Sequence, residues 1–235
     1  MPPEEAEVLP VPPFVAICHR TSDRDWFNFA LVAEAPEPAQ VAPAVAELRR
    51  LFAERDRKLK IEFNEAVWPE LAPELEAAGL RLRERNPLMA CTARDLRPLR
   101  AEGVVVRLLR RNEPEPVLAA FQSIRFGRPV ESALVEELRV NLRRGRGSYA
   151  LAAVGAEPAG TAVLHALEGT GEVVGVATRP EFRRRGVAAA ATSFLCERHF
   201  RGGGRLVFLD SANEEASRVY ERLGFQRFGA LLVYV

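Results

Sequence analysis

A strand-to-helix junction at residues 175–188, with the sequence GVATRPEFRRRGVA, constrains the fold of this chain more than any other segment. An apolar run passes through Pro180 into three consecutive arginines and Gly186, and an alanine-rich helical stretch follows. The first amides of a helix lack partners within it and lie at the positive end of its dipole, and glycine lets a ligand approach closely. The junction therefore predicts a diphosphate site. A merely solvated helix start is the alternative, which the flanking strand, Pro180, Gly186 and Ala188 disfavour.

Apolar runs and helical spacing divide the rest of the chain into a lead-in and two halves. Residues 1–13 hold five prolines and three glutamates and are expected to be a flexible lead-in. The first half is expected to contain strands near 14–19, 27–33, 60–63 and 80–92 and helices near 41–52 and 68–78. The second half is expected to follow the order β-α-α-β-β-β-α-β-α-β, with helices near 114–125, 131–143, 185–200 and 213–223. The expected fold class is α/β with a mixed sheet, and the second half alone has the elements of a mixed α/β domain.

Composition excludes several classes of protein. The chain has 33 Lys and Arg against 32 Asp and Glu, so the broad positive field that nucleic-acid and anionic-membrane binders use is missing. No apolar run reaches the roughly 20 residues that span a bilayer, and the acidic, proline-rich start does not resemble a signal peptide. The three cysteines and three histidines lie in no metal-ligand spacing. We expect a cytoplasmic protein with no metal, no membrane partner and no nucleic-acid partner.

Two motifs in the second half carry a family resemblance. The pattern Arg183-x-x-Gly186-x-Ala188 resembles the acyl-CoA pyrophosphate loop of the GNAT superfamily of N-acyltransferases, whose pattern is Gln or Arg, two residues, Gly, one residue, and Gly or Ala. Downstream, Asn213-x-x-Ala216-x-x-x-Tyr220-Glu221-Arg222-Leu223-Gly224-Phe225 is similar to the second motif of that superfamily, at the expected distance. The resemblance implies a GNAT N-acetyltransferase domain over residues 104–235.

The first half, residues 14–100, resembles only a degenerate GNAT-like copy. The segment 75–80 can be laid on 220–225, and each is followed by an extended run. Pro36 and Pro38 stand where an arginine-rich glycine loop should precede the helix, and Leu75 stands at the position of Tyr220. Any helix that glycine stops before a strand would look similar, so a tandem pair and two unrelated halves are both open.

The resemblance also implies acetyl-CoA as co-substrate and assigns its contacts. Amides that follow Arg183 would hold the pyrophosphate, the strand would pair with the pantetheine, and a backbone N–H near Val176 or Ala177 would receive the oxyanion. The expected cofactor-binding residues are Val176, Ala177, Thr178, Arg183, Arg184, Arg185, Gly186, Val187, Ala188, Ala189 and Asn213.

Tyr220 and Glu172 are the expected catalytic residues. By resemblance, the Tyr220 phenol protonates the departing CoA thiolate, whereas without the resemblance a core tyrosine is the default interpretation. Glu172 is the carboxylate best placed by sequence to accept the amine proton, with an exposed strand-end glutamate or a water molecule as alternatives. Asn213 suits a helix cap as well as a CoA contact. Cys196 fits a small buried side chain better than an acyl carrier.

The function that these expectations favour is transfer of an acetyl group from acetyl-CoA to a primary amine of a small molecule or peptide, by direct attack in a ternary complex. A non-catalytic acyl-CoA sensor is the alternative, motivated by the degenerate first half and the lack of an obvious base. Nucleic-acid binding through Arg183–Arg185 is disfavoured by the net charge and by the absence of interleaved aromatic residues. The first half either shapes the acceptor pocket or imitates the second subunit of a dimer, and a homodimer is open.

Overall fold

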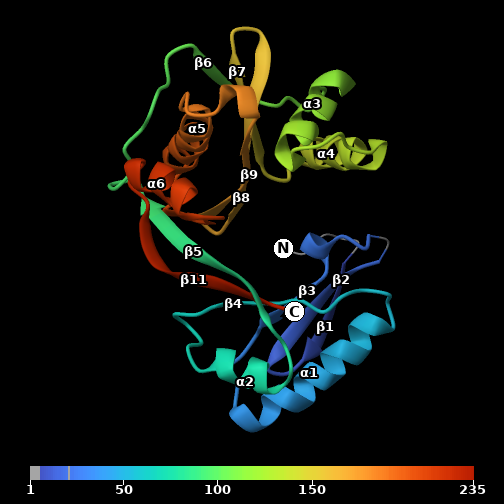
Figure 1. Ribbon diagram of the computed structural model, residues 1–235. Helices are drawn as coiled ribbons and strands as arrows, with labels where there is room; N and C mark the ends of the chain where they lie inside the picture. The colour runs from blue at the N-terminus through green and yellow to red at the C-terminus, as the bar shows by residue number, and fades with distance from the viewer. Residues whose placement is uncertain (1–5, 21) are drawn as a thin grey trace. The chain divides into compact units, whose positions relative to one another are not determined.

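The structure is a computed structural model and describes residues 6–20 and 22–235 (Figure 1). The chain divides into two compact units. Unit 1 combines the residues up to Leu88 with Phe228–Val235, and unit 2 consists of Met89–Arg227. The site-bearing junction therefore lies within unit 2.

Within its described residues, unit 1 contains two helices, α1 (Pro38–Ala53) and α2 (Leu71–Ala77), and a 3-10 turn at Asp25–Phe27. Its strands are β1 (Ala6–Val11), β2 (Phe14–His19), β3 (Phe29–Val32) and β4 (Ile61–Asn64), with most of β5 (Leu82–Thr92) and β11 (Gln226–Tyr234). β1, β2 and β3 pair antiparallel in that order, β3 runs parallel to β4, and β4 is antiparallel to β11. The elements follow the expected alternation, with β1 as an addition.

Strand β1 corrects our expectation that residues 1–13 form a flexible lead-in. It pairs with β2 along its whole length, from Ala6↔His19 to Val11↔Phe14. Pro10 is tolerated because β1 is the edge strand, where a missing backbone donor costs no ladder bond. Residues 1–5 of the expected lead-in lie outside the described residues.

Helix α1 packs against β1 and β2 through one apolar stripe (Figure 1). Val41, Val45, Leu48 and Phe52 recur at helical spacing, and all four are buried in the core of unit 1. Pro38 occupies the first turn, where its missing N–H has no helical acceptor to bond. Helix α2 packs against α1, so both helices of unit 1 are in one layer.

The elements of unit 2 follow the order expected for the second half as far as α6 (Glu214–Arg222), and the expected last strand, β11, lies mostly in unit 1. Those in unit 2 are β6 (Val104–Leu108), α3 (Glu115–Phe126), α4 (Ser132–Arg144), β7 (Ser148–Val154), β8 (Glu157–Leu167), β9 (Thr170–Thr178), the 3-10 turn η2 (Pro180–Phe182), α5 (Val187–Arg201), β10 (Leu206–Asp210) and α6. The helix expected from Arg185 begins at Val187, because Gly186 is the N-cap with a φ of 76°. The predicted α/β class is confirmed.

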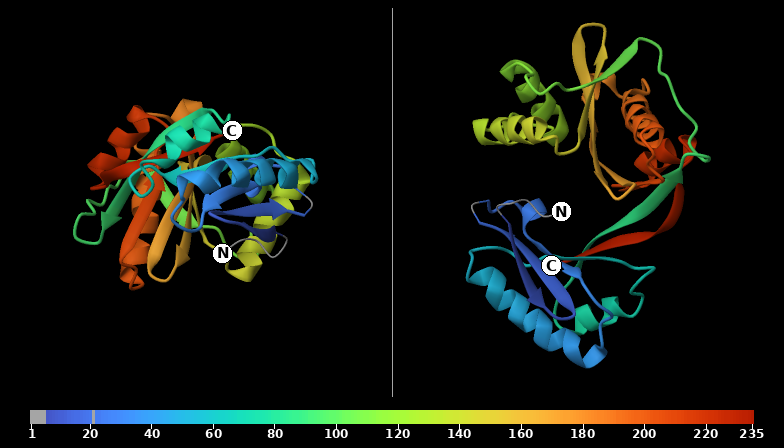
Figure 2. Two further views of the ribbon diagram at one scale, coloured as in Figure 1. Left: turned by 90° about the horizontal axis from the view of Figure 1, so that it is seen from below. Right: turned by 180° about the vertical axis from the view of Figure 1, so that it is seen from behind.

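The helices of unit 2 cover both faces of its strands, α5 on one face and α3 with α4 on the other (Figures 1 and 2). Alternate strand residues divide accordingly. Ala150 and Leu164 pack with α5, whereas Tyr149 and Val163 pack with α3 and α4. Among the residues that the structure describes, no helix has the length and apolarity needed to cross a bilayer.

The described strands form one mixed sheet with the order β1-β2-β3-β4-β11-β5-β10-β9-β8-β7-β6. β5 and β11 each contribute residues to both units. The units therefore differ from the expected halves 14–100 and 104–235. Residues 89–100 belong to unit 2 and residues 228–235 to unit 1, because strand pairing joins segments that are distant in the sequence.

Candidate active site

The parallel strands β9 and β10 part beside the expected diphosphate loop. Their register covers three residue pairs and ends at Glu172↔Phe208, although β9 continues to Thr178. On its other edge β9 stays paired with β8 as far as Gly160↔Thr178. Residues 173–178 of β9 therefore have a backbone edge, on the side away from β8, that pairs with no strand in the described part of the sheet. The N–H and C=O groups of this edge can hydrogen-bond an extended polar ligand.

A bulge interrupts β9 within this stretch. The β8–β9 register shifts between Thr161 and Val163, and Gly175 opposite has a φ of 59°. The Thr161 hydroxyl donates a hydrogen bond of 3.0 Å to the Gly175 carbonyl, which fixes the irregular backbone. A bulge redirects the backbone amides that follow it, here those of Val176 and Ala177.

The loop between β9 and α5 has two left-handed residues, Arg184 with a φ of 59° and Gly186 with a φ of 76°. Left-handed turns before a helix gather backbone N–H groups into a concave anion site, and the first amides of α5 add to it. Gly186 is also closely packed, since a Cβ atom placed there would lie 2.8 Å from the Ala101 Cβ. The loop is therefore both cationic and sterically restricted to glycine at one position.

Two arginines of this segment pack on the ring of Phe182. The guanidinium carbons of Arg179 and Arg185 lie 5.5 and 5.6 Å from the centre of its ring. Arg179 also forms an ion pair with Glu181. Arg183 belongs to the cavity described next.

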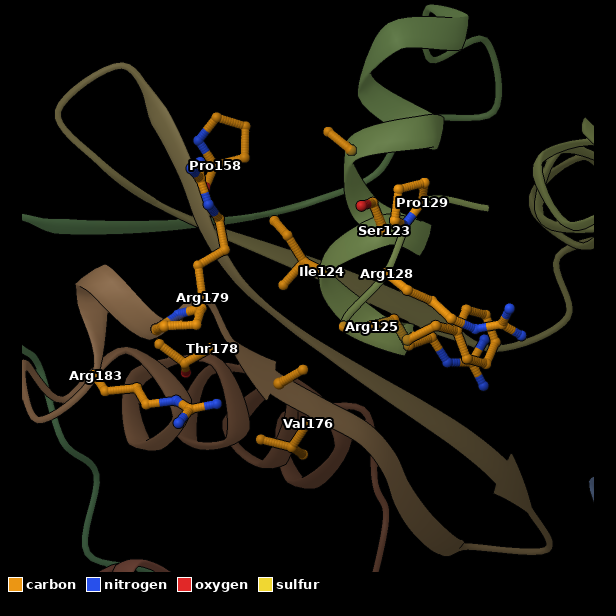
Figure 3. Close-up of a pocket in the computed structure, with 15 residues that line it drawn as sticks. Ser123, Ile124, Arg125, Arg128, Pro129, Pro158, Val176, Thr178, Arg179 and Arg183 are labelled. Atoms are coloured by element: carbon orange, nitrogen blue, oxygen red, sulfur yellow. The ribbon is translucent and has the colours of Figure 1, made fainter. Parts of the chain in front are cut away.

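A cavity of about 880 Å³ lies between the end of β9 and the connection from α3 to α4 (Figure 3). One wall consists of Val176, Ala177, Thr178, Arg179, Pro180 and Arg183 with Pro158. The opposite wall consists of Ala120 and residues 123–129. Of the expected cofactor-binding residues, the cavity thus brings together Val176, Ala177, Thr178 and Arg183.

The chemistry of this cavity fits acyl-CoA. The Thr178 Oγ1 atom is buried and has no hydrogen-bond partner within the described residues, so its hydrogen-bonding capacity is unsatisfied beside the cavity. The strand edge can bond the pantetheine amides, and the arginine-rich loop suits the pyrophosphate. Residues 184–189 would hold the phosphates and Thr178 the pantetheine.

Tyr220 lies on α6, outside the lining of this cavity, and is 8% exposed. Burial and, to a smaller extent, the nearby Asp210 carboxylate raise the pKa of its phenol to about 12. Its ring packs at 5.9 Å from that of Phe225. Tyr220 is thus a core residue whose phenol is protonated at neutral pH.

Glu172 occupies the last β9 position that pairs with β10, and it pairs with His165 on β8. Since Val174 packs with α3 and α4, strand alternation puts the half-buried Glu172 on the same face of the sheet. The glutamate therefore lies where the strands part, but it does not line the 880 Å³ cavity. Cys196 is buried in α5, and burial raises the pKa of its thiol, which suits a packing role.

Asn213 caps helix α6. Its Oδ1 atom accepts a hydrogen bond of 2.9 Å from the Ala216 amide, and Glu214 and Glu215 follow in the first turn. The cap that the sequence left open is confirmed, and it orients the helix that carries Tyr220.

Replacing Asn213 by Ala is expected to lower the free energy of unfolding by about 1 kcal/mol, because the Ala216 amide loses its acceptor. Asn213→Asp keeps an acceptor and is expected to cost much less. Urea unfolding of both variants measures the difference, and equal losses would contradict the cap. Acetyl-CoA affinity measured alongside reports any additional contact to the ligand.

Sequence reasoning missed the helical wall of the cavity, where Arg125 and Arg128 flank Gly127. Gly127 is the left-handed C-cap of α3. An arginine in the last turn of a helix is also expected simply from the helix dipole, so the sequence offered no distinguishing signal.

Comparison with known proteins agrees with this geometry. Residues 113–225 match the acetyltransferase (GNAT) family, and this segment is a GNAT domain. A mycothiol acetyltransferase from Streptomyces bingchenggensis is 30% identical over 161 residues, which cover 64% of this chain and 52% of that protein. The chain spans about half the length of the curated relatives it matches.

Solved structures share the fold of the whole chain. A GCN5-related N-acetyltransferase from Kribbella flavida has a TM-score of 0.83 at 27% identity and covers 98% of this chain and 89% of its own. A tandem GNAT protein from the clavulanic acid biosynthesis pathway has a TM-score of 0.66 at 16% identity and covers 94% of this chain and 77% of its own. The second likeness concerns the fold alone.

Proposed function

We propose that this protein transfers an acetyl group from acetyl-CoA to a primary amine of a small molecule or peptide. The observation that carries the proposal is the parting of β9 and β10 beside the loop of Arg183 to Gly186. This arrangement offers strand hydrogen bonds to an extended chain and helix amides to its phosphates in one continuous path. The GNAT match over residues 113–225 and the acetyltransferase relatives support the same reaction.

The proposed reaction is direct attack in a ternary complex. The amine nitrogen attacks the thioester carbon, and an amide near Val176 or Ala177 donates to the oxyanion that develops. The C–S bond breaks as the C–N bond is completed, and the Tyr220 phenol gives its proton to the leaving thiolate. The proton that the amine loses passes to Glu172, directly or through water.

We further infer that unit 1 is a degenerate GNAT-like copy without a diphosphate site. Its helix α1 follows Glu34 and Glu37 and begins with Pro38. The glutamates oppose an anion at the helix start, and the proline removes one of the amides that would bind it. The likeness to a tandem GNAT protein supports this assignment.

Calorimetric titration with acetyl-CoA is expected to give a stoichiometry of about one per chain. Within the described residues, the junction in unit 2 combines free helix amides with arginines that form no ion pair, whereas the start of α1 in unit 1 carries glutamates and a proline. An amine panel of amino acids, polyamines, amino sugars and short peptides then tests turnover by release of free CoA thiol. Absence of acetyl-CoA binding overturns the site. Binding without acetylation of any amine would favour the acyl-CoA sensor instead.

A further inference from the structure

The large cavity of unit 2 is strongly cationic. Its described lining includes four arginines and neither aspartate nor glutamate. Figure 3 shows Arg179 and Arg183 on the wall formed by β9 and the loop, and Arg125 and Arg128 on the wall formed by the end of α3. The cavity therefore carries positive charge on both sides.

The two walls have different relations to the proposed acetyl-CoA site. Arg179 is neutralised by Glu181, and Glu157 lies 3.9 Å from it. Arg183 belongs to the loop between β9 and α5, which is proposed to hold the phosphates of acetyl-CoA. The charge on this wall is thus accounted for by neighbouring carboxylates and by the phosphates that the loop is proposed to hold.

Arg125 lacks an ion pair of this kind within residues 6–20 and 22–235. Its guanidinium carbon lies 5.2 Å from the centre of the Phe126 ring. Burial lowers the pKa of its guanidinium, with Tyr149 and Glu137 acting in the opposite direction. Arg125 is half-buried, and a partly desolvated cation without a hydrogen-bonded anion is costly, so a ligand that supplies the anion would be stabilised there.

The Arg125 side chain also reaches the strand where the reaction is proposed to occur. A Cβ atom placed on Gly175 would lie 2.6 Å from the Arg125 Nε atom, so the arginine crosses β9 at the bulge. Gly175 immediately precedes Val176, whose amide region is proposed to receive the oxyanion. An anion bound to Arg125 would therefore be held beside the part of β9 at which the thioester is proposed to react.

Resting on the proposed acetyl transfer, we propose that Arg125 binds a carboxylate of the acceptor, so that the acceptor is an amino acid or a similar molecule carrying both a primary amine and a carboxylate. The planar guanidinium can bond both carboxylate oxygens, which fixes the orientation of the amine. The acceptor is favoured over the acyl group as the source of the carboxylate, because Arg125 lies on the wall opposite the phosphate loop.

Matched acceptor pairs test this assignment. Each free amino acid is compared with its carboxamide, with acetyl-CoA as donor. The acid is expected to be preferred at least about tenfold in kcat/KM, since a charge-assisted hydrogen bond distinguishes the two. Arg125→Gln is expected to lower kcat/KM for the acid about 10- to 100-fold and kcat/KM for the amide much less, so that the preference for the acid is lost.

Two further variants serve as controls for the Arg125→Gln result. Arg125→Lys keeps the charge but not the planar fork, so partial recovery of the acid preference is expected. Arg143→Gln removes the same charge from an exposed position in the last turn of α4 and is expected to leave the preference intact.

Several outcomes overturn the assignment while leaving the acetyltransferase proposal in place. They are equal turnover of acid and amide, an Arg125→Gln effect on the Kd of acetyl-CoA alone, and a preference for succinyl-CoA that depends on Arg125. If no amine is acetylated, the acetyltransferase proposal fails separately. Titration of the CoA-bound protein with N-acetylamino acids and their amides then decides, and absence of binding that needs both the carboxylate and Arg125 overturns the assignment.

Discussion

Tyr220→Phe is expected to lower kcat about 100-fold, because a positioned general acid contributes two or more orders of magnitude to the step in which the thiolate leaves. The acetyl-CoA Kd is expected to stay within about twofold, because the ring is buried and Phe fills the same space. The phenol pKa of about 12 keeps the proton in place throughout the working pH range. Steady-state kinetics and calorimetry on the same preparations measure both quantities.

Tyr234→Phe is the matched control. Tyr234 is also buried, and burial, with the hydrogen bond to Glu76, raises the pKa of its phenol to about 12. It belongs to unit 1, where the substitution removes a 3.0 Å bond to Glu76 and is expected to cost about 1 kcal/mol of stability with no loss of kcat. The comparison separates loss of a buried phenol from loss of an acid.

The pH dependence adds a second criterion. A Tyr220 pKa of about 12 predicts that no alkaline loss of kcat below about pH 11 comes from this group, since its proton is lost only as the pH rises through that value. Glu172→Gln is expected to lower kcat/KM, because the amine proton then has no carboxylate to pass to. Full turnover by Tyr220→Phe would assign Tyr220 to the core alone, as its packing on Phe225 also permits.

The sequence was most informative where structure is local. The arginine–glycine junction and the Asn213 cap depend on a few consecutive residues, and the left-handed φ of Gly186 and the 2.9 Å cap bond follow directly from those residues. The order of elements in unit 2 was predictable for the same reason, because amphipathic periodicity and turn residues are read along the chain.

Long-range pairing could not be read in this way. Pro10 and its neighbours predict a flexible start when taken alone, and only the pairing of β1 with β2 makes residues 6–11 a strand. Residues 228–235 belong to unit 1 because β11 pairs with β4, and the paired residues are separated by more than half the chain. Arg125 was missed because its role is suggested by the strand bulge that it crosses, not by its neighbours in sequence.

Gly186→Ala is expected to weaken acetyl-CoA binding at least about tenfold, because two independent constraints fall on this residue. Its φ of 76° costs an alanine about 1–2 kcal/mol, and the added Cβ would lie 2.8 Å from the Ala101 Cβ, so the loop has to move. Displacement of the loop moves the amides that are proposed to hold the pyrophosphate. Calorimetry measures the Kd, and thermal unfolding measures the loss of stability.

Gly203→Ala supplies the control, since Gly203 lies just beyond the other end of α5 with a φ of 89° and no atom within 4 Å of an added Cβ among the described neighbours. Gly203→Ala carries the same conformational penalty, but the added Cβ makes no close contact and the residue lies outside the loop between β9 and α5. Stability is therefore expected to fall while the Kd of acetyl-CoA stays unchanged. Adding Ala101→Gly to Gly186→Ala removes the contact but not the strained φ. If the double variant recovers acetyl-CoA affinity, the contact with Ala101 is what positions the loop amides. If it does not recover affinity, the left-handed backbone at residue 186 is what positions them. Unchanged acetyl-CoA affinity in Gly186→Ala itself would mean that the phosphates bind elsewhere.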